Sequence, residues 1–148
     1  NNEPDHIYQE FEVVPNADYT IQIITSFKSL ENNNPPMDSM LELRVLAGSG
    51  YVSGYSPTYY SDTVEFPQDG YGYETLPQVE DADNNLLVEV RSNPSDTSYI
   101  TTTYTFNAGN NDSVALFVRG IGGDSGGDFG YNSGDEEIRM DSVTITAN

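Results

Sequence analysis

The sequence of 148 residues contains no cysteine, no tryptophan and only one histidine. Without cysteine, disulfide bonds and thiolate metal sites are excluded, so burial of apolar surface must stabilise the fold, with a metal ion as the available supplement. The one histidine, His6, lies near the N-terminus, where chains usually fray. A Ser-His-Asp triad would have to use it, so catalysis of that kind is not expected.

Basic residues are also scarce, because 5 Lys and Arg stand against 24 Asp and Glu, for a net charge of −19 at pH 7. Phosphate binding needs clustered Lys and Arg, so nucleic acid and anionic membranes are not expected as partners. The charge suits a solvated surface in salty water, as in a marine bacterium, and it also suits carboxylates gathered around calcium. Both interpretations can hold together.

Long apolar runs are absent, since no stretch approaches the roughly 18 apolar residues of a membrane span, and we expect no signal peptide within these residues. The chain begins abruptly with Asn1-Asn2-Glu3-Pro4. We expect it to be a segment of a longer, secreted precursor. Its length suits a single domain covering residues 1–148.

Apolar and polar residues alternate along most of the chain, and no long segment has a helical apolar stripe. This pattern, interrupted by Gly, Asn, Asp and Pro, predicts an all-β sandwich or jelly roll. Residues 108–111 are interpreted as the turn of a hairpin. The expected strands cover residues 7–14, 19–28, 40–47, 86–92, 99–107, 113–120 and 137–146.

The last expected strand changes phase, because Ile138 and Met140 have one parity while Val143 and Ile145 have the other. One extra residue in the strand would place all four on the same face. We therefore expect a β-bulge near Asp141. Bulges often lie beside functional or metal sites, so Asp141 is a candidate site residue.

Tyrosine is concentrated in residues 50–74 among Gly, Ser, Pro and Asp. Tyrosine offers a flat apolar face for a sugar ring and a hydroxyl for its polar groups. The alternative is that these rings pack inside and around the rim of a sheet, as they often do in strands. The candidate carbohydrate-binding residues are Tyr51, Tyr55, Tyr59, Tyr71, Tyr73, Arg44 and Arg91.

Carboxylate catalysis has little support, because with 24 acidic residues some pair would lie at a suitable separation in any fold. The Glu-x-Asp-x-x-Glu strand of laminarinase-type hydrolases is absent. The segment Leu41-Glu42-Leu43-Arg44 matches only part of the Arg-x-Glu-Leu-Arg strand of certain alginate lyases. We interpret it as an ordinary strand with a charged outer face, and we expect no catalytic residue.

Three segments resemble carbohydrate-binding modules of the family 4, 9, 16 and 22 type. Residues 13–21 resemble their V-x-P-x-x-x-Y-x-hydrophobic segment, and residues 104–116 resemble their F-x-A-G-x-x-x-x-V-x-L segment. Residues 134–145 are similar to their closing strand, hydrophobic-D-x-V-x-hydrophobic. The order and spacing of the three segments also fit.

This resemblance implies a β-jelly roll of two antiparallel sheets, attached to a secreted polysaccharide-degrading enzyme. It also implies a structural Ca²⁺ with Asp141 as a ligand. The N-G-x-F-E opening strand of the family, which contributes to that site, is missing here, so Glu3 or Asp5 would have to replace it. Family members often stack sugars on tryptophan, a role that tyrosine must take in this chain.

The sequence thus predicts a secreted, monomeric, non-catalytic module that binds polysaccharide and targets an attached enzyme. The negative charge favours a neutral β-linked plant or algal glycan, while an alginate-type polyanion stays open if calcium or a local Arg cluster bridges the repulsion. A ligand-free spacer or adhesion domain of a cell-surface protein is the main alternative. A small jelly-roll lyase or hydrolase is a minor one.

Overall fold

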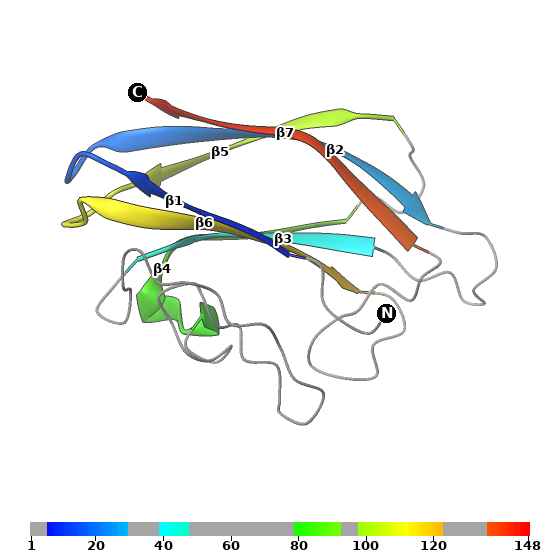
Figure 1. Ribbon diagram of the computed structural model, residues 1–148, viewed down its shortest axis with the longest axis horizontal. Helices are drawn as coiled ribbons and strands as arrows, with labels where there is room; N and C mark the ends of the chain where they lie inside the picture. Colours follow the sequence, from blue (N-terminus) through cyan, green and yellow to red (C-terminus); the bar gives the residue numbers. More distant parts are fainter. Residues whose placement is uncertain (1–5, 30–38, 48–78, 93–97, 123–135) are drawn as a thin grey trace.

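The computed structural model describes residues 6–29, 39–47, 79–92, 98–122 and 136–148, which form two antiparallel β-sheets packed face to face (Figure 1). The expected all-β sandwich is therefore confirmed. One sheet has the strand order β1-β6-β3-β4 and the other has the order β5-β2-β7. Strands β2 and β7 pack over β3, and β5 packs over β4.

The chain changes sheet at most of its connections, as in a jelly roll. A short 3₁₀ turn, η1 (Ala82–Asn84), precedes β4. Within the described residues, no helix is long and apolar enough to cross a membrane. The strands are β1 (His6–Glu12), β2 (Asp18–Ser29), β3 (Ser39–Leu46), β4 (Asn85–Ser92), β5 (Ile100–Asn107), β6 (Ser113–Gly122) and β7 (Glu136–Ala147).

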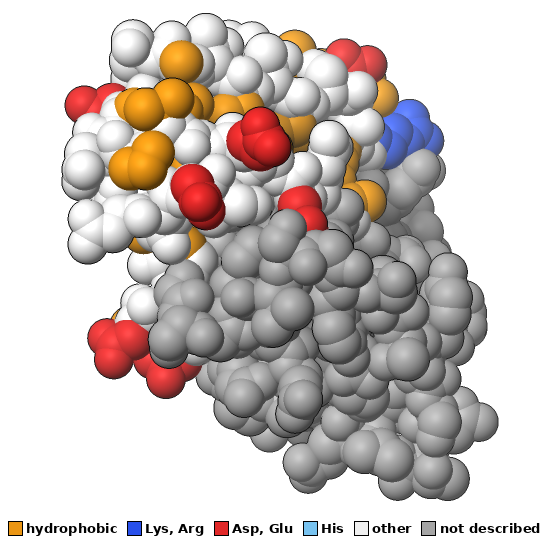
Figure 2. Space-filling view, turned by 60° about the vertical axis from the view of Figure 1, so that its left-hand side comes forward, with side chains coloured by type: hydrophobic (Ala, Val, Ile, Leu, Met, Phe, Trp, Pro, Cys, Tyr) orange, Lys and Arg blue, Asp and Glu red, His pale blue; other side chains and the backbone are white. Residues whose placement is uncertain are grey.

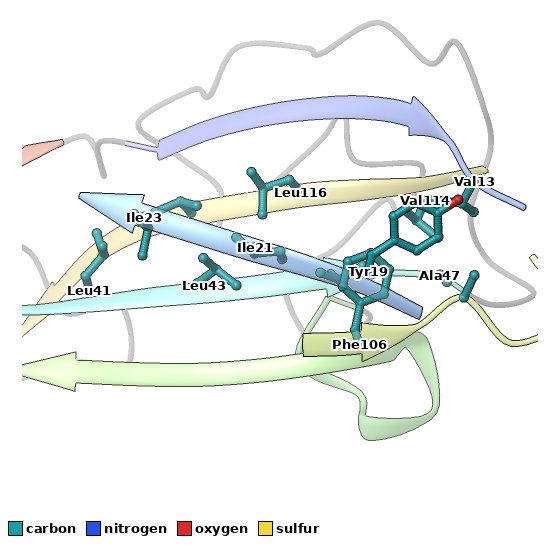
Figure 3. Packing of buried hydrophobic residues seen from close by; sticks show 13 residues of the cluster. Val13, Tyr19, Ile21, Ile23, Leu41, Leu43, Ala47, Phe106, Val114 and Leu116 are labelled. Atoms are coloured by element: carbon teal, nitrogen blue, oxygen red, sulfur yellow. The ribbon is translucent and has the colours of Figure 1, made fainter. Parts of the chain in front are cut away.

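The core lies between the two sheets and is built from alternate residues of the strands, as period-2 patterning requires (Figure 3). From the middle strand β2, Ile21, Ile23 and Thr25 are at most 2% exposed. From the facing sheet, Leu43 of β3 and Val118 of β6 are buried against them. Each fully buried aliphatic side chain contributes roughly 1.5–3 kcal/mol through removal from water.

One end of the sandwich is closed by two turns that bond to each other, one after β1 and one after β5. Asn16 N donates to Gly109 O at 2.6 Å, and Ala108 N donates to Ala17 O at 2.9 Å. Asn16 and Gly109 both have positive φ, 61° and 57°, a conformation that Asn and Gly adopt most readily. Asn107 Nδ2 adds bonds to Asn16 O and to the carboxylate of Asp18.

Beneath these turns, the rings of Tyr19 and Phe106 stack with centroids 5.4 Å apart and planes 16° apart (Figure 3). The hydroxyl of Tyr19 accepts a hydrogen bond from Val14 N at 2.8 Å. The segments 13–21 and 104–116, which carry two of the sequence motifs, therefore meet in space. The stacked rings join neighbouring strands of the β5-β2-β7 sheet, and the Tyr19 hydroxyl fixes the turn after β1 to that sheet.

The expected hairpin at residues 108–111 is wrong. Strand β5 pairs with β2, whereas β6 pairs with β1 and β3 in the opposite sheet. The turn bonds to the β1–β2 turn instead of closing a ladder between its own flanking strands. Phe106 belongs to the β5-β2-β7 sheet and Val114 to the β1-β6-β3-β4 sheet, so the chain crosses from one sheet to the other here, and both side chains are buried in the core.

Candidate functional site

The five candidate tyrosines lie outside the described residues, and so do Glu3 and Asp5. The tyrosine platform and the first half of the calcium site therefore stay predictions. Arg91 lies in β4, where its backbone pairs with that of Leu41 on β3. Of the sequence-derived candidates, Arg44 and Asp141 are the two whose side-chain surroundings can be examined.

Arg44 belongs to a buried group of charges on the face of β3 and β6 that points away from the core. Its Nη2 lies 3.0 Å from Oε1 of Glu42, and its Nη1 donates to Val79 O at 3.4 Å. Glu42 also pairs with Arg119, whose Nε donates to Oε2 of Glu42. The Nη2 of Arg119 lies 2.9 Å from Oε1 of Glu80. Arg44 is thus engaged by protein groups and shows 7% of its surface.

The charged outer face expected for this strand exists, but it is not solvated. Glu42 and Arg119 are 4% and 5% exposed, and the neighbouring Phe117 and Leu46 are fully buried. The guanidinium of Arg119 also lies 5.7 Å from the centre of the Phe117 ring, a distance at which cation–π attraction operates. The four-stranded sheet is therefore buried on both faces around β3 and β6.

The pairing sets the charge states of this group. Burial by itself raises the pKa of Glu42, but the hydrogen bonds and positive charges of Arg44 and Arg119 outweigh burial and lower it below its ordinary value of 4.5. Burial lowers the pKa of Arg119, and Glu42 and Glu80 outweigh that effect and raise it. Both groups are therefore held in their charged forms.

Asp141 is the extra residue of a bulge in β7. Met140 pairs with Thr25 of β2 and Ser142 pairs with Ile24, so Asp141 has no partner in the ladder. The expected bulge is confirmed, and as a result Met140, Val143 and Ile145 all pack against the core. Asp141 itself is exposed.

The described residues alone do not complete a calcium site. They contain no group of three or more His, Asp or Glu side chains placed to hold a metal ion. In the view of Figure 2, their surface is largely polar and uncharged, and most of its acidic side chains stand apart from one another. Ca²⁺ takes six to eight oxygen ligands, so Asp141 would need further ligands from elsewhere in the chain.

A second candidate binding surface lies on the outer side of the β5-β2-β7 sheet, and we call it the threonine face. The strand registers align its positions in three rows, and none of the nine carries a charge. Six of them are threonine. The rows are Thr105–Thr20–Thr146, Thr103–Gln22–Thr144 and Thr101–Ile24–Ser142.

The threonine face is open to solvent. Residues 101, 103, 105, 22, 144 and 146 are exposed, and the other three positions are partly buried. Within a row, residues on neighbouring strands lie roughly 4.8 Å apart, and the rows follow one another along the strands at intervals of about 6.8 Å. Hydroxyl and amide groups thus form a regular, neutral array of hydrogen-bond donors and acceptors.

Sequence reasoning missed this surface, although its signal is visible as Thr101-x-Thr103-x-Thr105 and Thr144-x-Thr146. Threonine is favoured in strands for its β-branched shape alone, so the pattern by itself does not distinguish a binding face from an ordinary solvated one. The register of β5, β2 and β7 supplies the missing fact, because it brings separate threonines into one array.

Comparison with known proteins gives no relative: no family model, no curated protein and no solved structure matches this chain.

Proposed function

We propose that this domain binds polysaccharide without acting on it chemically, and that it keeps an attached polysaccharide-degrading enzyme on its substrate. The observation that carries the proposal is the threonine face, a neutral array of hydroxyl and amide groups in a chain with a net charge of −19. Tethering of this kind raises the effective concentration of the enzyme at its substrate without any new chemistry.

The favoured ligand is a neutral β-linked glycan. A sugar polymer presents many hydroxyl groups, which threonine hydroxyls and the Gln22 amide can both donate to and accept from. A polyanion would meet the negative field of the whole protein, and two of the described arginines, Arg44 and Arg119, are already paired with glutamates. An alginate-type ligand would need calcium or another basic cluster.

Secretion and a structural Ca²⁺ are part of the same proposal. Secretion is what the resemblance to carbohydrate-binding modules implies, and the support for the ion is the acidic composition and the bulge that exposes Asp141 beside the ladder. A bulge leaves backbone groups out of the regular pairing, and carbonyl oxygens are suitable calcium ligands. The ion would stabilise the fold by mass action and would take no part in sugar chemistry.

Affinity electrophoresis tests the proposal directly. The domain is run through native gels containing laminarin, xylan, agarose or alginate, beside an acidic protein that binds no glycan. Retardation in at least one neutral gel is the expected result. Equal relative mobility in every gel would contradict the proposal and favour a ligand-free spacer or adhesion domain. New reducing ends or unsaturated uronates after incubation would instead indicate a lyase or hydrolase.

A further inference from the structure

Tyr99 stands at the end of the threonine face. It immediately precedes β5, and 55% of its surface is exposed. Burial along β5 alternates, with the exposed positions at Thr101, Thr103 and Thr105. Tyr99 precedes the paired part of β5, and an extended backbone there would place its ring in line with the β5 threonines on the outer side of the sheet.

We propose that Tyr99 is the stacking residue of the threonine face: it packs against one pyranose ring of an uncharged glycan, and the following rings lie over the β5 threonines. This inference rests on the proposed polysaccharide binding and names the residues and ligand class of that function. The occupant is a neutral, linear, β-linked polysaccharide.

The chemistry of the surface suits this occupant. A pyranose ring has an apolar face of C–H groups and a polar edge of hydroxyls, so it pairs with an aromatic ring beside hydrogen-bonding side chains. Tyr99 offers the ring, and Thr101, Thr103 and Thr105 offer hydroxyls at regular intervals of about 6.8 Å. None of these four side chains is charged. The surface therefore suits an uncharged ligand, which needs no counter-charge from the protein.

The other large exposed apolar side chains of the described residues do not offer the same combination. They are Ile7, Val14, Val88 and Val90, all aliphatic, so Tyr99 is the one aromatic residue among the large exposed hydrophobics of these segments. Val88 and Val90 lie on β4, in the opposite sheet. They pair there with Arg44 and Glu42, away from the threonine face.

Four variants test the assignment in the full chain. Tyr99→Ala removes the ring, Tyr99→Phe keeps the ring without its hydroxyl, and Thr103→Asp places a charge in the middle of the β5 line. Val90→Asp is the matched control, because it adds the same charge at an exposed strand position that is 51% exposed on the other sheet. Circular dichroism and thermal melting confirm that each variant is folded.

Binding is measured by affinity electrophoresis in graded laminarin, xylan and agarose, and by calorimetry with the soluble glycan that retards the wild type most. We expect Tyr99→Ala and Thr103→Asp each to weaken binding by about tenfold or more, the scale of one lost aromatic contact. Tyr99→Phe and Val90→Asp should stay within about twofold of wild type, since a tenfold change requires about 1.4 kcal/mol.

The outcomes separate this inference from the proposed function. If the wild type binds a neutral glycan and all four variants bind equally well, the site lies elsewhere and the assignment to Tyr99 is overturned while the function stands. If the wild type binds alginate alone, the neutral ligand class is overturned. If the wild type binds none of the glycans, both the function and the assignment fall.

Discussion

Glu42 of β3 and Arg119 of β6 are cross-strand neighbours that form a buried ion pair on the outer side of their sheet. Arg44 and Glu80 extend this pair into a group of two acids and two bases. A buried charge is tolerated when it is paired and hydrogen-bonded, but it becomes costly when its partner is removed. Glu42 is the member that both arginines share, so the balance of the group depends on it.

Replacing Glu42 should therefore be strongly destabilising. Glu42→Gln keeps the shape but leaves Arg44 and Arg119 without their shared counter-charge, and we expect a loss of about 3–5 kcal/mol in the free energy of unfolding. Glu80→Gln is the control, because the Glu80 side chain is 41% exposed and its pairing is screened by solvent. It should cost under about 1 kcal/mol. Urea denaturation measures both, and equal losses would contradict the central role of Glu42.

The same pair predicts how stability depends on pH. The folded protein holds the pKa of Glu42 below 4.5, so around that value the unfolded chain binds more protons at this site than the folded protein does. The contribution of Glu42 is therefore complete above the unfolded pKa and is lost as the pH falls through the folded value. The stability difference between wild type and Glu42→Gln should shrink as the pH is lowered through that range.

Comparing the two proteins also cancels the titration of the other carboxylates, since all of the 24 acidic residues except Glu42 are present in both. Thermal melts of the two proteins at matched ionic strength, from neutral pH to below pH 4.5, give the required curves. A difference that stays constant over the whole range would contradict the lowered pKa.

Tyr19 is expected to stabilise the fold through its hydroxyl as well as its ring. Tyr19→Phe keeps the stacking on Phe106 but leaves Val14 N without its acceptor, and we expect a loss of about 1 kcal/mol. Tyr19→Ala also removes a buried ring and should cost about 3–5 kcal/mol. The control is Tyr99→Phe, which is exposed and should leave the melting temperature unchanged. If Tyr19→Phe is as stable as wild type, the hydrogen bond contributes nothing.

The two turns at the closed end should respond differently to substitution, because loss of a glycine at positive φ is costly and gain of one is not. Gly109 has a φ of 57°, and an added Cβ would find only ordinary contacts, the nearest at 3.6 Å. Gly109→Ala should therefore cost about 1–2 kcal/mol from backbone conformation alone. Asn16→Gly, at a φ of 61°, should be nearly neutral. Denaturant midpoints measure both effects, and an unaffected Gly109→Ala would show that the turn can relax.

Calcium binding is tested by melting the domain in EDTA and in excess Ca²⁺. If Asp141 is a ligand, Ca²⁺ should raise the melting temperature of the wild type. At a free Ca²⁺ concentration one hundred times the dissociation constant, the free energy of unfolding should increase by about 2.7 kcal/mol. Asp141→Asn should reduce or abolish that increase while changing little in EDTA, because Asp141 is exposed and unpaired in the ladder. Identical melting of the wild type in both conditions would rule out a stabilising site.

The sequence predicts the strands well because apolar and polar residues alternate along most of them, even where both faces of the sheet are buried. In β2, Ile21, Ile23 and Thr25 face the core, and the phase change in β7 places the bulge at Asp141. The assignment of strands to sheets is harder, since the segment before Ser113 fits either a hairpin or a crossover by local pattern. Here the crossover is decided by bonds between distant turns, such as that of Asn16 with Gly109.

Burial of charge was not predictable for a similar reason. Glu42 and Arg44 alternate with Leu41 and Leu43 in the way that solvated residues of a half-exposed strand do. Their burial depends on partners at positions 79, 80 and 119, far away along the chain. The threonine face likewise depends on three strands aligning in register, which local spacing does not specify.

The pairing of β2 has a consequence for how the chain reaches this structure. Its two neighbours are β5, which begins at Ile100, and β7, which ends at Ala147, so the central strand of this sheet has no ladder partner until the last part of the chain is available. Such non-local pairing slows folding, because distant segments must meet before their contacts form. During synthesis, β2 must therefore wait for β5 before it has its first ladder partner, and for β7 before it has its second.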